Sequence, residues 1–182
     1  ILCLNYDGLY GINNINRFLQ AGNKNKAFNW GIGTYKVGDP ILFNESNRFA
    51  PLIYNNMKGR IVKLWENKET YFFDISLEIA IDQISARGYD FELLSTPEAT
   101  TSTIRIRVSK YRSTDNDNER IEDMVPFQVA YAISIHKAQG LEYDSVKIVI
   151  SNEVDEKITH NIFYTAITRA RKNLKIYWSP EV

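Results

Sequence analysis

The chain has 182 residues, of which 44% are hydrophobic and 13% aromatic, and its formal net charge at neutral pH is zero. This apolar content is enough for a folded core, and the charge balance excludes a polybasic, histone-like binder while leaving room for local basic patches. The single cysteine, Cys3, rules out an internal disulfide and fits a reducing, cytoplasmic location. We expect no membrane partner, because no apolar run is long enough for a span and no secretory signal is recognisable.

The first 20 residues have the pattern of a strand followed by a helix. Ile1–Leu4 is an apolar run that predicts a buried strand, and Gly8 and Gly11 then break the chain. From Ile12 to Gln20 the apolar residues recur at helical spacing. Strand, glycine turn and helix make half of a βαβ unit. Because the sequence begins with Ile inside an apolar run, we expect it to be part of a longer protein.

The middle of the chain has a different pattern, and we predict that residues 28–125 form an inserted β domain. After a polar linker at 23–29, short apolar runs between turn signals predict strands at 41–43, 61–64, 71–73 and 104–108. Apolar residues at helical spacing predict a helix over 77–87. The polar stretches 95–103 and 113–123 are expected to be exposed loops, and the acidic one does not have the spacing of a calcium loop. A small β-barrel or meander is the expected result.

The pattern returns to that of a buried core at Pro126. Alternating apolar residues from Phe127 to Ile133 predict one buried strand, and Ser134 is placed to cap a short helix that ends at Gly140. The near-continuous apolar run 146–150 predicts a strand of a parallel sheet.

A helix capped by Thr159 and a strand at 174–178 are predicted to close the chain. Three polar or basic residues are predicted to share one face of this helix: Thr165, Arg169 and Lys172. Its apolar residues would form the buried stripe. The fold class is therefore α/β with a mostly parallel sheet, formed by residues 1–27 and 126–182 and interrupted by the insert.

Two stretches of this domain resemble a known family. Ala132–Glu142 resembles motif V and Tyr164–Ala170 resembles motif VI of superfamily 1 DNA helicases, most closely the RecD-like branch and more distantly the UvrD-type enzymes. Gly8–Gln20 is similar to the start of the second motor domain of that branch. Gly38–Pro40 and the segment 55–62 resemble its inserted SH3-like barrel. The resemblance implies a second RecA-like domain, of the P-loop NTPase type, with an SH3-like insert.

The resemblance also implies roles for single residues. In such motors ATP with Mg²⁺ lies between two RecA-like domains, and Arg169 matches the arginine finger that reaches the γ-phosphate, the expected catalytic residue. Gly140 and Glu142 match the positions that approach the nucleotide, so that with Arg169 they form the expected ATP-binding set. Single-stranded DNA is the expected partner of three polar residues: Ser134, His136 and Lys137. No metal ligand is expected within this chain.

The sequence contains no G-x-x-x-x-G-K-[ST] phosphate loop. We therefore expect the chain to be inactive alone and to share ATP with an N-terminal motor domain of a full-length ATP-dependent DNA helicase. Two alternatives stay open: an RNA helicase, and a non-catalytic nucleic-acid-binding or protein-interaction module derived from a helicase. Translocation polarity, DNA or RNA preference, attached domains and oligomeric state are not predicted.

Overall fold

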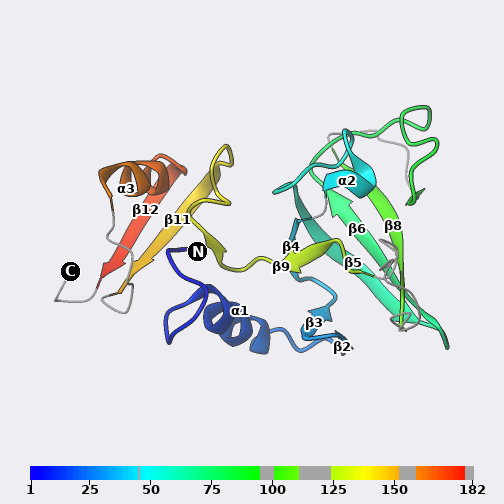
Figure 1. Cartoon of the computed structure of the whole chain (residues 1–182), viewed down its shortest axis with the longest axis horizontal. Helices are drawn as coiled ribbons and strands as arrows, with labels where there is room; N and C mark the ends of the chain where they lie inside the picture. The colour runs from blue at the N-terminus through cyan, green and yellow to red at the C-terminus, as the bar shows by residue number, and fades with distance from the viewer. Residues whose placement is uncertain (45, 95–100, 111–123, 152–158, 179–182) are drawn as a thin grey trace. The chain divides into compact units, whose positions relative to one another are not determined.

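A computed structural model describes the chain apart from residues 45, 95–100, 111–123, 152–158 and 179–182 (Figure 1). The contacts divide the chain into two compact units, and we describe each unit by itself. Residues 1–22 and 130–182 form the first unit, and residues 23–129 form the second. From the sequence we predicted the ends of the insert at residues 28 and 125, which lie a few residues from the ends of the second unit.

The first unit contains a four-stranded sheet in the order β10-β1-β11-β12, and every neighbouring pair is parallel. This sheet confirms the predicted α/β class. Its strands are β1 (Leu2–Cys3), β10 (Ile133–Ser134), β11 (Tyr143–Ile150) and β12 (Ala170–Trp178). Two helices complete the unit: α1 (Ile12–Ala21) and α3 (His160–Ile167). The Thr159 hydroxyl accepts a hydrogen bond from the Ile162 amide at 3.3 Å and so caps α3, as predicted.

Both faces of β11 are packed. Val146, Ile148 and Ile150 are buried on one face. On the other face Ser145 and Lys147 are exposed, whereas Val149 packs against the buried cluster of the unit, which consists of Cys3, Ile12 and Ala132. The glycine before α1 has a steric reason, because a Cβ atom on Gly11 would lie 2.2 Å from the backbone oxygen of Asp7. The strand, glycine turn and helix predicted at the amino end are thus all present.

Asn16 ties α1 to the segment that enters β10. Its side-chain amide donates to the Ala132 carbonyl at 2.9 Å, and its side-chain oxygen accepts from the Ala132 amide at 2.8 Å. Both backbone groups of fully buried Ala132 are therefore satisfied by one side chain. The sequence analysis gave Asn16 no such role.

We expect Asn16→Ala to lower the free energy of unfolding of the chain by about 1–3 kcal/mol, because it leaves two buried backbone groups without partners. Urea unfolding followed by circular dichroism measures the change. Asn13→Ala is the matched control, since Asn13 lies on the same helix and makes only an exposed bond to Asp7. Equal losses in the two variants would contradict the role given to Asn16.

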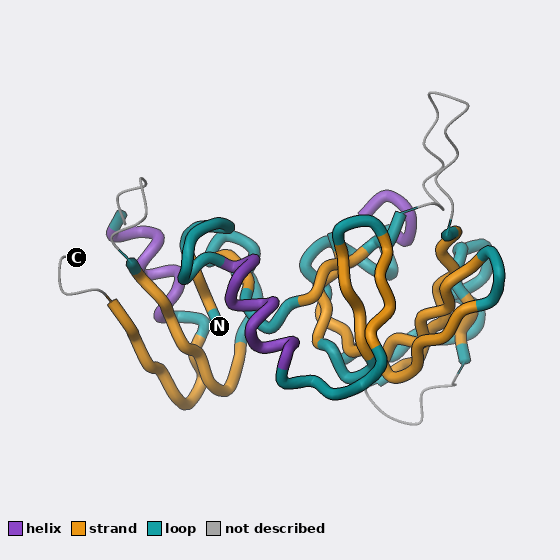
Figure 2. Tube along the Cα trace, turned by 90° about the horizontal axis from the view of Figure 1, so that it is seen from below, coloured by secondary structure: helices purple, strands orange, loops and turns teal. Residues whose placement is uncertain are grey.

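The second unit contains an antiparallel sheet of six strands in the order β7-β8-β6-β5-β4-β9; Figure 2 draws strands in orange. The strands are β4 (Pro40–Phe43), β5 (Lys58–Glu66), β6 (Thr70–Leu77), β7 (Glu92–Leu93), β8 (Ser102–Ser109) and β9 (Phe127–Val129). A two-stranded ribbon, β2 (Ala27–Trp30) and β3 (Gly33–Lys36), and a short helix, α2 (Ser46–Phe49), accompany the sheet. The predicted strands are present, and the SH3-like character of this unit stays a prediction.

An aromatic cluster fills the core of the second unit. Phe127 packs edge-on against Phe73, Phe43 and Tyr35, with ring centroids 5.2, 5.7 and 5.8 Å away. Burial raises the pKa of the Tyr35 hydroxyl to about 12. The alternation predicted for 104–108 is confirmed, since Ile104, Ile106 and Val108 are fully buried.

Three predictions about local structure are wrong. Residues 77–87 form no helix: Leu77 ends β6, and turns follow in which the Asp82 carboxylate accepts from the amides of Ile84 and Ser85. The linker predicted at 23–29 already contains the start of β2. The exposed loop predicted to reach residue 103 ends sooner, because Ser102 is buried at the start of β8. The acidic stretch 113–123 lies outside the described residues.

The strand predicted over 127–133 is two strands in different units. β9 pairs with β4 in the second unit, whereas β10 pairs with β1 in the first. The period-two pattern of the sequence does not describe the burial here, because both residues of β10 are buried and only Phe127 is buried in β9.

Residues 135–142 connect β10 to β11, which are separated by β1 in the sheet. Ser134 and Val149 both pair with Cys3, so the connection begins level with the carboxyl end of β11 and returns to Tyr143 at its amino end. We call residues 135–142 the crossover segment.

Turns replace the short helix that was predicted in the crossover segment. The Ala138 amide donates to the Ser134 and Ile135 carbonyls at 3.1 and 3.2 Å, and the Leu141 amide donates to the Ala138 carbonyl at 3.0 Å. Gly140 has φ +81°, a conformation that L side chains rarely adopt, so glycine is required at this turn. Gly140 is therefore needed for the backbone conformation of this turn, in addition to the close approach to the nucleotide that was predicted for it.

Candidate nucleotide and nucleic-acid site

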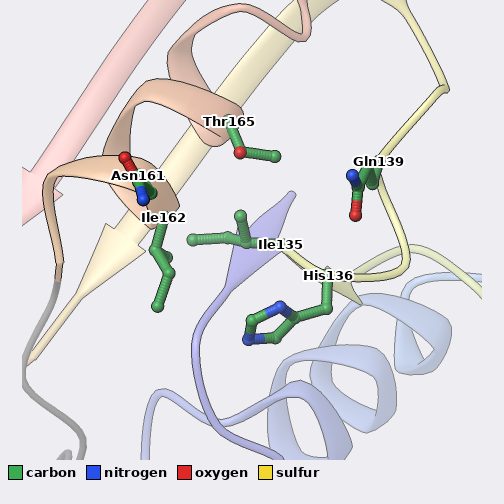
Figure 3. A pocket seen from close by; sticks show the side chains of 6 residues that line it. All are labelled: Ile135, His136, Gln139, Asn161, Ile162 and Thr165. Atoms are coloured by element: carbon green, nitrogen blue, oxygen red, sulfur yellow. The ribbon is translucent and has the colours of Figure 1, made fainter.

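The first part of the crossover segment lies against the amino-terminal half of α3. Together they line a pocket of about 220 Å³ (Figure 3). Its lining residues are Ile135, His136, Gln139, Asn161, Ile162 and Thr165. Amide, hydroxyl and imidazole groups therefore share this pocket with two aliphatic side chains. The sequence analysis singled out only His136 of these as a binding residue.

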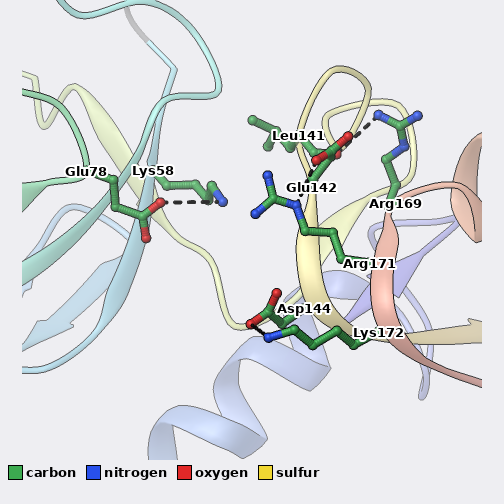
Figure 4. Close-up of polar contacts among 8 residues, drawn as sticks. All are labelled: Lys58, Glu78, Leu141, Glu142, Asp144, Arg169, Arg171 and Lys172. Atoms are coloured by element: carbon green, nitrogen blue, oxygen red, sulfur yellow. Dashed lines mark hydrogen bonds and ion pairs between the residues drawn. The ribbon is translucent and has the colours of Figure 1, made fainter. Parts of the chain in front are cut away.

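Arg169 lies at the other end of the crossover segment. Its guanidinium donates three hydrogen bonds. Nη1 donates to the Leu141 carbonyl at 3.1 Å (Figure 4), Nε to the Thr165 carbonyl at 3.0 Å and Nη2 to the Thr168 hydroxyl at 3.0 Å. The side chain is half-buried. A guanidinium has five N–H groups, so two remain for another acceptor beyond these three bonds.

The helical face predicted for Arg169 is wrong. α3 ends at Ile167, Arg169 lies in the turn that follows, and Lys172 already belongs to β12. Arg169 is thus held on the crossover segment next to Gly140 and Glu142, rather than projecting from a polar helix surface. Its backbone takes part as well, because the Tyr143 amide donates to the Arg169 carbonyl at 2.9 Å.

Glu142 forms an ion pair with Arg171, with 2.7 Å between Oε2 and Nε (Figure 4). Lys172 forms a second pair with Asp144 at 2.9 Å. All four side chains are more than half exposed, so water screens each pair and neither contributes much to stability. The Glu142 carboxylate raises the pKa of Arg171 through their hydrogen bond and opposite charge.

A β-bulge explains why consecutive cations reach two acids on the neighbouring strand. Tyr143 pairs with Ala170 and Ser145 with Asn173, so two steps along β11 face three steps along β12. In a regular strand Arg171 and Lys172 would point to opposite faces. The extra residue lets Arg171 reach Glu142 while Lys172 reaches Asp144.

The three residues predicted to contact DNA differ in exposure. His136 is exposed and Lys137 is half-buried, whereas Ser134 is only 4% exposed. The Ser134 hydroxyl accepts a hydrogen bond from the Lys137 amide at 3.1 Å. The capping role predicted for Ser134 is therefore present, although it caps a turn and not a helix.

The six candidate residues fall at the two ends of one segment. Ser134, His136 and Lys137 lie at its start beside β10, and Gly140 and Glu142 lie at its end, where Arg169 joins them. The sequence analysis missed the polar lining of the pocket and the pairing of Glu142 with Arg171. Both depend on the register between the crossover segment, α3 and β12.

Other kinds of site find little support in the part of the chain that the structure describes. There, no three His, Cys, Asp or Glu side chains come together as a metal ion would require. Cys3 is fully buried, and burial raises the pKa of its thiol to about 11, so it is a poor nucleophile at neutral pH. The same ranges contain no helix that is long and apolar enough to cross a membrane.

Comparison with known sequences finds a helicase family and several RecD proteins among the relatives. Residues 129–177 match the family described as UvrD-like helicase C-terminal domain. The RecBCD enzyme subunit RecD of Buchnera aphidicola subsp. Schizaphis graminum is 26% identical over 189 residues, covering all of this chain and 25% of that protein. RecD of Mycolicibacterium smegmatis is 23% identical over 97% of this chain and 24% of its own length. The chain thus spans about a quarter of the length of the curated relatives it matches.

Comparison with solved structures supports the fold. The crystal structure of Pif1 helicase from Candida albicans covers 97% of this chain and 45% of that protein, with a TM-score of 0.54 and 12% sequence identity. At that identity the likeness concerns the fold alone, which is that of a RecA-like helicase C-terminal domain. The family match over residues 129–177, the RecD relatives and this shared fold together support a C-terminal domain of the superfamily 1 helicases, of the UvrD-like and RecD-like type.

Proposed function

We propose that this chain is the second motor domain of an ATP-dependent helicase that translocates on single-stranded DNA. One observation carries the proposal: the Arg169 guanidinium is hydrogen-bonded to the Leu141 carbonyl, between the two other residues assigned to the nucleotide, Gly140 and Glu142. A cation, an exposed glycine and a carboxylate therefore lie at one end of the crossover segment. Such a set suits the triphosphate and ribose of a nucleotide.

The residues present fit ATP with Mg²⁺ as a ligand shared with another domain. Arg169 has donors beyond its three bonds to the fold, and a guanidinium beside the γ-phosphate stabilises charge that develops during phosphoryl transfer. Glu142 can accept a ribose hydroxyl, because a carboxylate has about four lone-pair positions. The metal and the phosphate cradle would come from a P-loop domain, so this chain supplies orientation and charge only.

At the opposite end, the crossover segment presents groups that suit a phosphate backbone. His136 is exposed and can donate from its imidazole, and Lys137 carries an ammonium. Ser134 acts through the turn, since its hydroxyl holds the Lys137 amide. Single-stranded DNA is therefore the proposed partner of this end, and RNA is the alternative that the binding experiment must compare.

We expect Lys137→Ala in the full-length protein to weaken single-stranded DNA binding and to lower the slope of log K against log salt by about 0.7, the value for one phosphate contact on a single strand. Fluorescence anisotropy with DNA and RNA oligonucleotides at several salt concentrations measures both effects. Lys147→Ala is the control, because Lys147 is an exposed cation on β11.

An unchanged salt slope in Lys137→Ala would remove Lys137 from the proposed DNA site. Tighter binding of RNA than of DNA would favour an RNA helicase. Binding without any nucleic-acid-stimulated ATP hydrolysis would instead favour a non-catalytic module.

A further inference from the structure

We propose that Arg171 is a positioning residue for nucleotide binding, acting through Glu142. This inference rests on the proposed function, in which Glu142 faces the nucleotide. Arg171 itself is assigned no contact with ATP. Its ion pair with Glu142 holds the carboxylate at the end of the crossover segment, beside the carbonyl that fixes Arg169.

The first argument is that this end of the segment is held by a set of bonds from one neighbouring stretch. Arg169 donates to the Leu141 carbonyl, Tyr143 donates its amide to the Arg169 carbonyl, and Arg171 pairs with Glu142. Three successive residues, 141 to 143, are thus each bonded to residue 169 or 171. We call this set the clasp. It fixes the carboxylate and the guanidinium relative to each other.

The second argument is that stability does not explain the Arg171–Glu142 pair. Arg171 and Glu142 are 62% and 54% exposed, so water screens their attraction. The β-bulge that places Arg171 opposite Glu142 is nevertheless a specific departure from regular pairing. An exposed pair at a bulge beside a candidate nucleotide site is better explained by placement of the carboxylate than by stabilisation of the sheet.

The chain provides a matched control for this inference. Lys172 and Asp144 form an ion pair at the same bulge, with 68% and 61% of their side chains exposed. Neither residue belongs to the clasp, and Asp144 lies within β11, beyond the end of the crossover segment. Lys172→Ala therefore removes the same charge from β12 as Arg171→Ala does, and it leaves the Arg171–Glu142 pair in place.

The test uses steady-state ATP hydrolysis by the full-length protein with saturating single-stranded DNA. We expect Arg171→Ala to raise KM for ATP about threefold to tenfold, which is less than the effect of losing one direct charged hydrogen bond, and to leave kcat within about twofold. Lys172→Ala should leave KM unchanged. Arg171→Lys should restore part of the affinity, since an ammonium keeps the charge but not the planar geometry of a guanidinium.

A double-mutant cycle separates positioning from an independent effect. If Arg171 acts through Glu142, the KM of Glu142→Gln/Arg171→Ala should equal that of Glu142→Gln alone, because the two residues are coupled. Additive effects, or equal KM values in Arg171→Ala and Lys172→Ala, would overturn the inference while the proposed function stands. Absence of DNA-stimulated hydrolysis in the wild-type protein would overturn the proposed function, and the inference with it.

Discussion

Arg169→Ala should reduce DNA-stimulated ATP hydrolysis by the full-length protein about 10³-fold or more, in line with the effect of arginine fingers in related phosphoryl-transfer enzymes. The affinity for single-stranded DNA should stay within about twofold, because the residues proposed to contact DNA lie at the other end of the crossover segment, where loss of Arg169 should have little effect. The measurement compares kcat in a coupled ATPase assay with Kd from fluorescence anisotropy. Turnover at the wild-type rate would exclude Arg169 as the finger.

A control is needed because Arg169 also holds its surroundings. The three hydrogen bonds from its guanidinium to Thr165, Leu141 and Thr168 are lost in the alanine variant, so the fold itself is expected to loosen locally. Thr168→Val removes one of these acceptors and keeps the guanidinium, and it should retain most of the activity. If Thr168→Val is as inactive as Arg169→Ala, the loss reflects local structure and not charge at the γ-phosphate.

Phe127→Ala should cost about 3–5 kcal/mol of unfolding free energy in the second unit, the range for removing a large aromatic side chain from a packed core. Phe127 is 1% exposed and its ring contacts three others, those of Phe73, Phe43 and Tyr35. Urea unfolding monitored by tryptophan fluorescence measures the loss, since Trp30 and Trp65 both lie in this unit.

Tyr54→Ala provides the comparison within the same unit. The Tyr54 side chain is 53% exposed, so its removal should change stability by no more than about 0.5 kcal/mol. A loss of similar size in the two variants would show that the aromatic cluster is not the main source of stability in the second unit.

Elements with a strong local period could be predicted from the sequence. β8 alternates Ile, Arg, Ile, Arg and Val over 104–108, and the structure buries the aliphatic residues of that run. α1 was predictable for the same reason at helical spacing. The helix predicted at 77–87 is absent despite its helical spacing, because Leu77 belongs to β6 and the Asp82 carboxylate accepts from two backbone amides as an alternative to helical bonds.

Long-range arrangement could not be predicted from local patterns. Residues 127–133 alternate as one strand would, yet the chain passes from one unit to the other at 129/130. The spacing of apolar residues indicates which face of a strand is buried, but it does not indicate which of the two units buries that face. The hydrogen bonds between the Asn16 side chain and the Ala132 backbone could not be predicted for the same reason, because the two residues are 116 positions apart in sequence.

In the candidate site, too, local motifs could be predicted from the sequence and long-range contacts could not. The resemblance identified Gly140, Glu142 and Arg169 from short motifs, and the structure brings the segments that carry them together. The partner of Glu142 could not be found this way. Arg171 reaches it only because of the β-bulge between β11 and β12, and nothing in the sequence marks that bulge.

The crossover segment runs from the level of the carboxyl end of β11 back to its amino end. This path determines the distance between the proposed DNA-binding end and the proposed nucleotide-binding end. Ser134 is level with Val149 across β1, and six residue steps along β11 lead from Val149 to Tyr143, which at ~3.3 Å per residue is about 20 Å. The nine peptide steps from Ser134 to Tyr143 can reach about 30 Å when fully extended. The turns of the crossover segment therefore hold about 10 Å of unused length. A shift of several ångströms at Glu142 can be absorbed if these turns open, and otherwise it is passed on to Lys137.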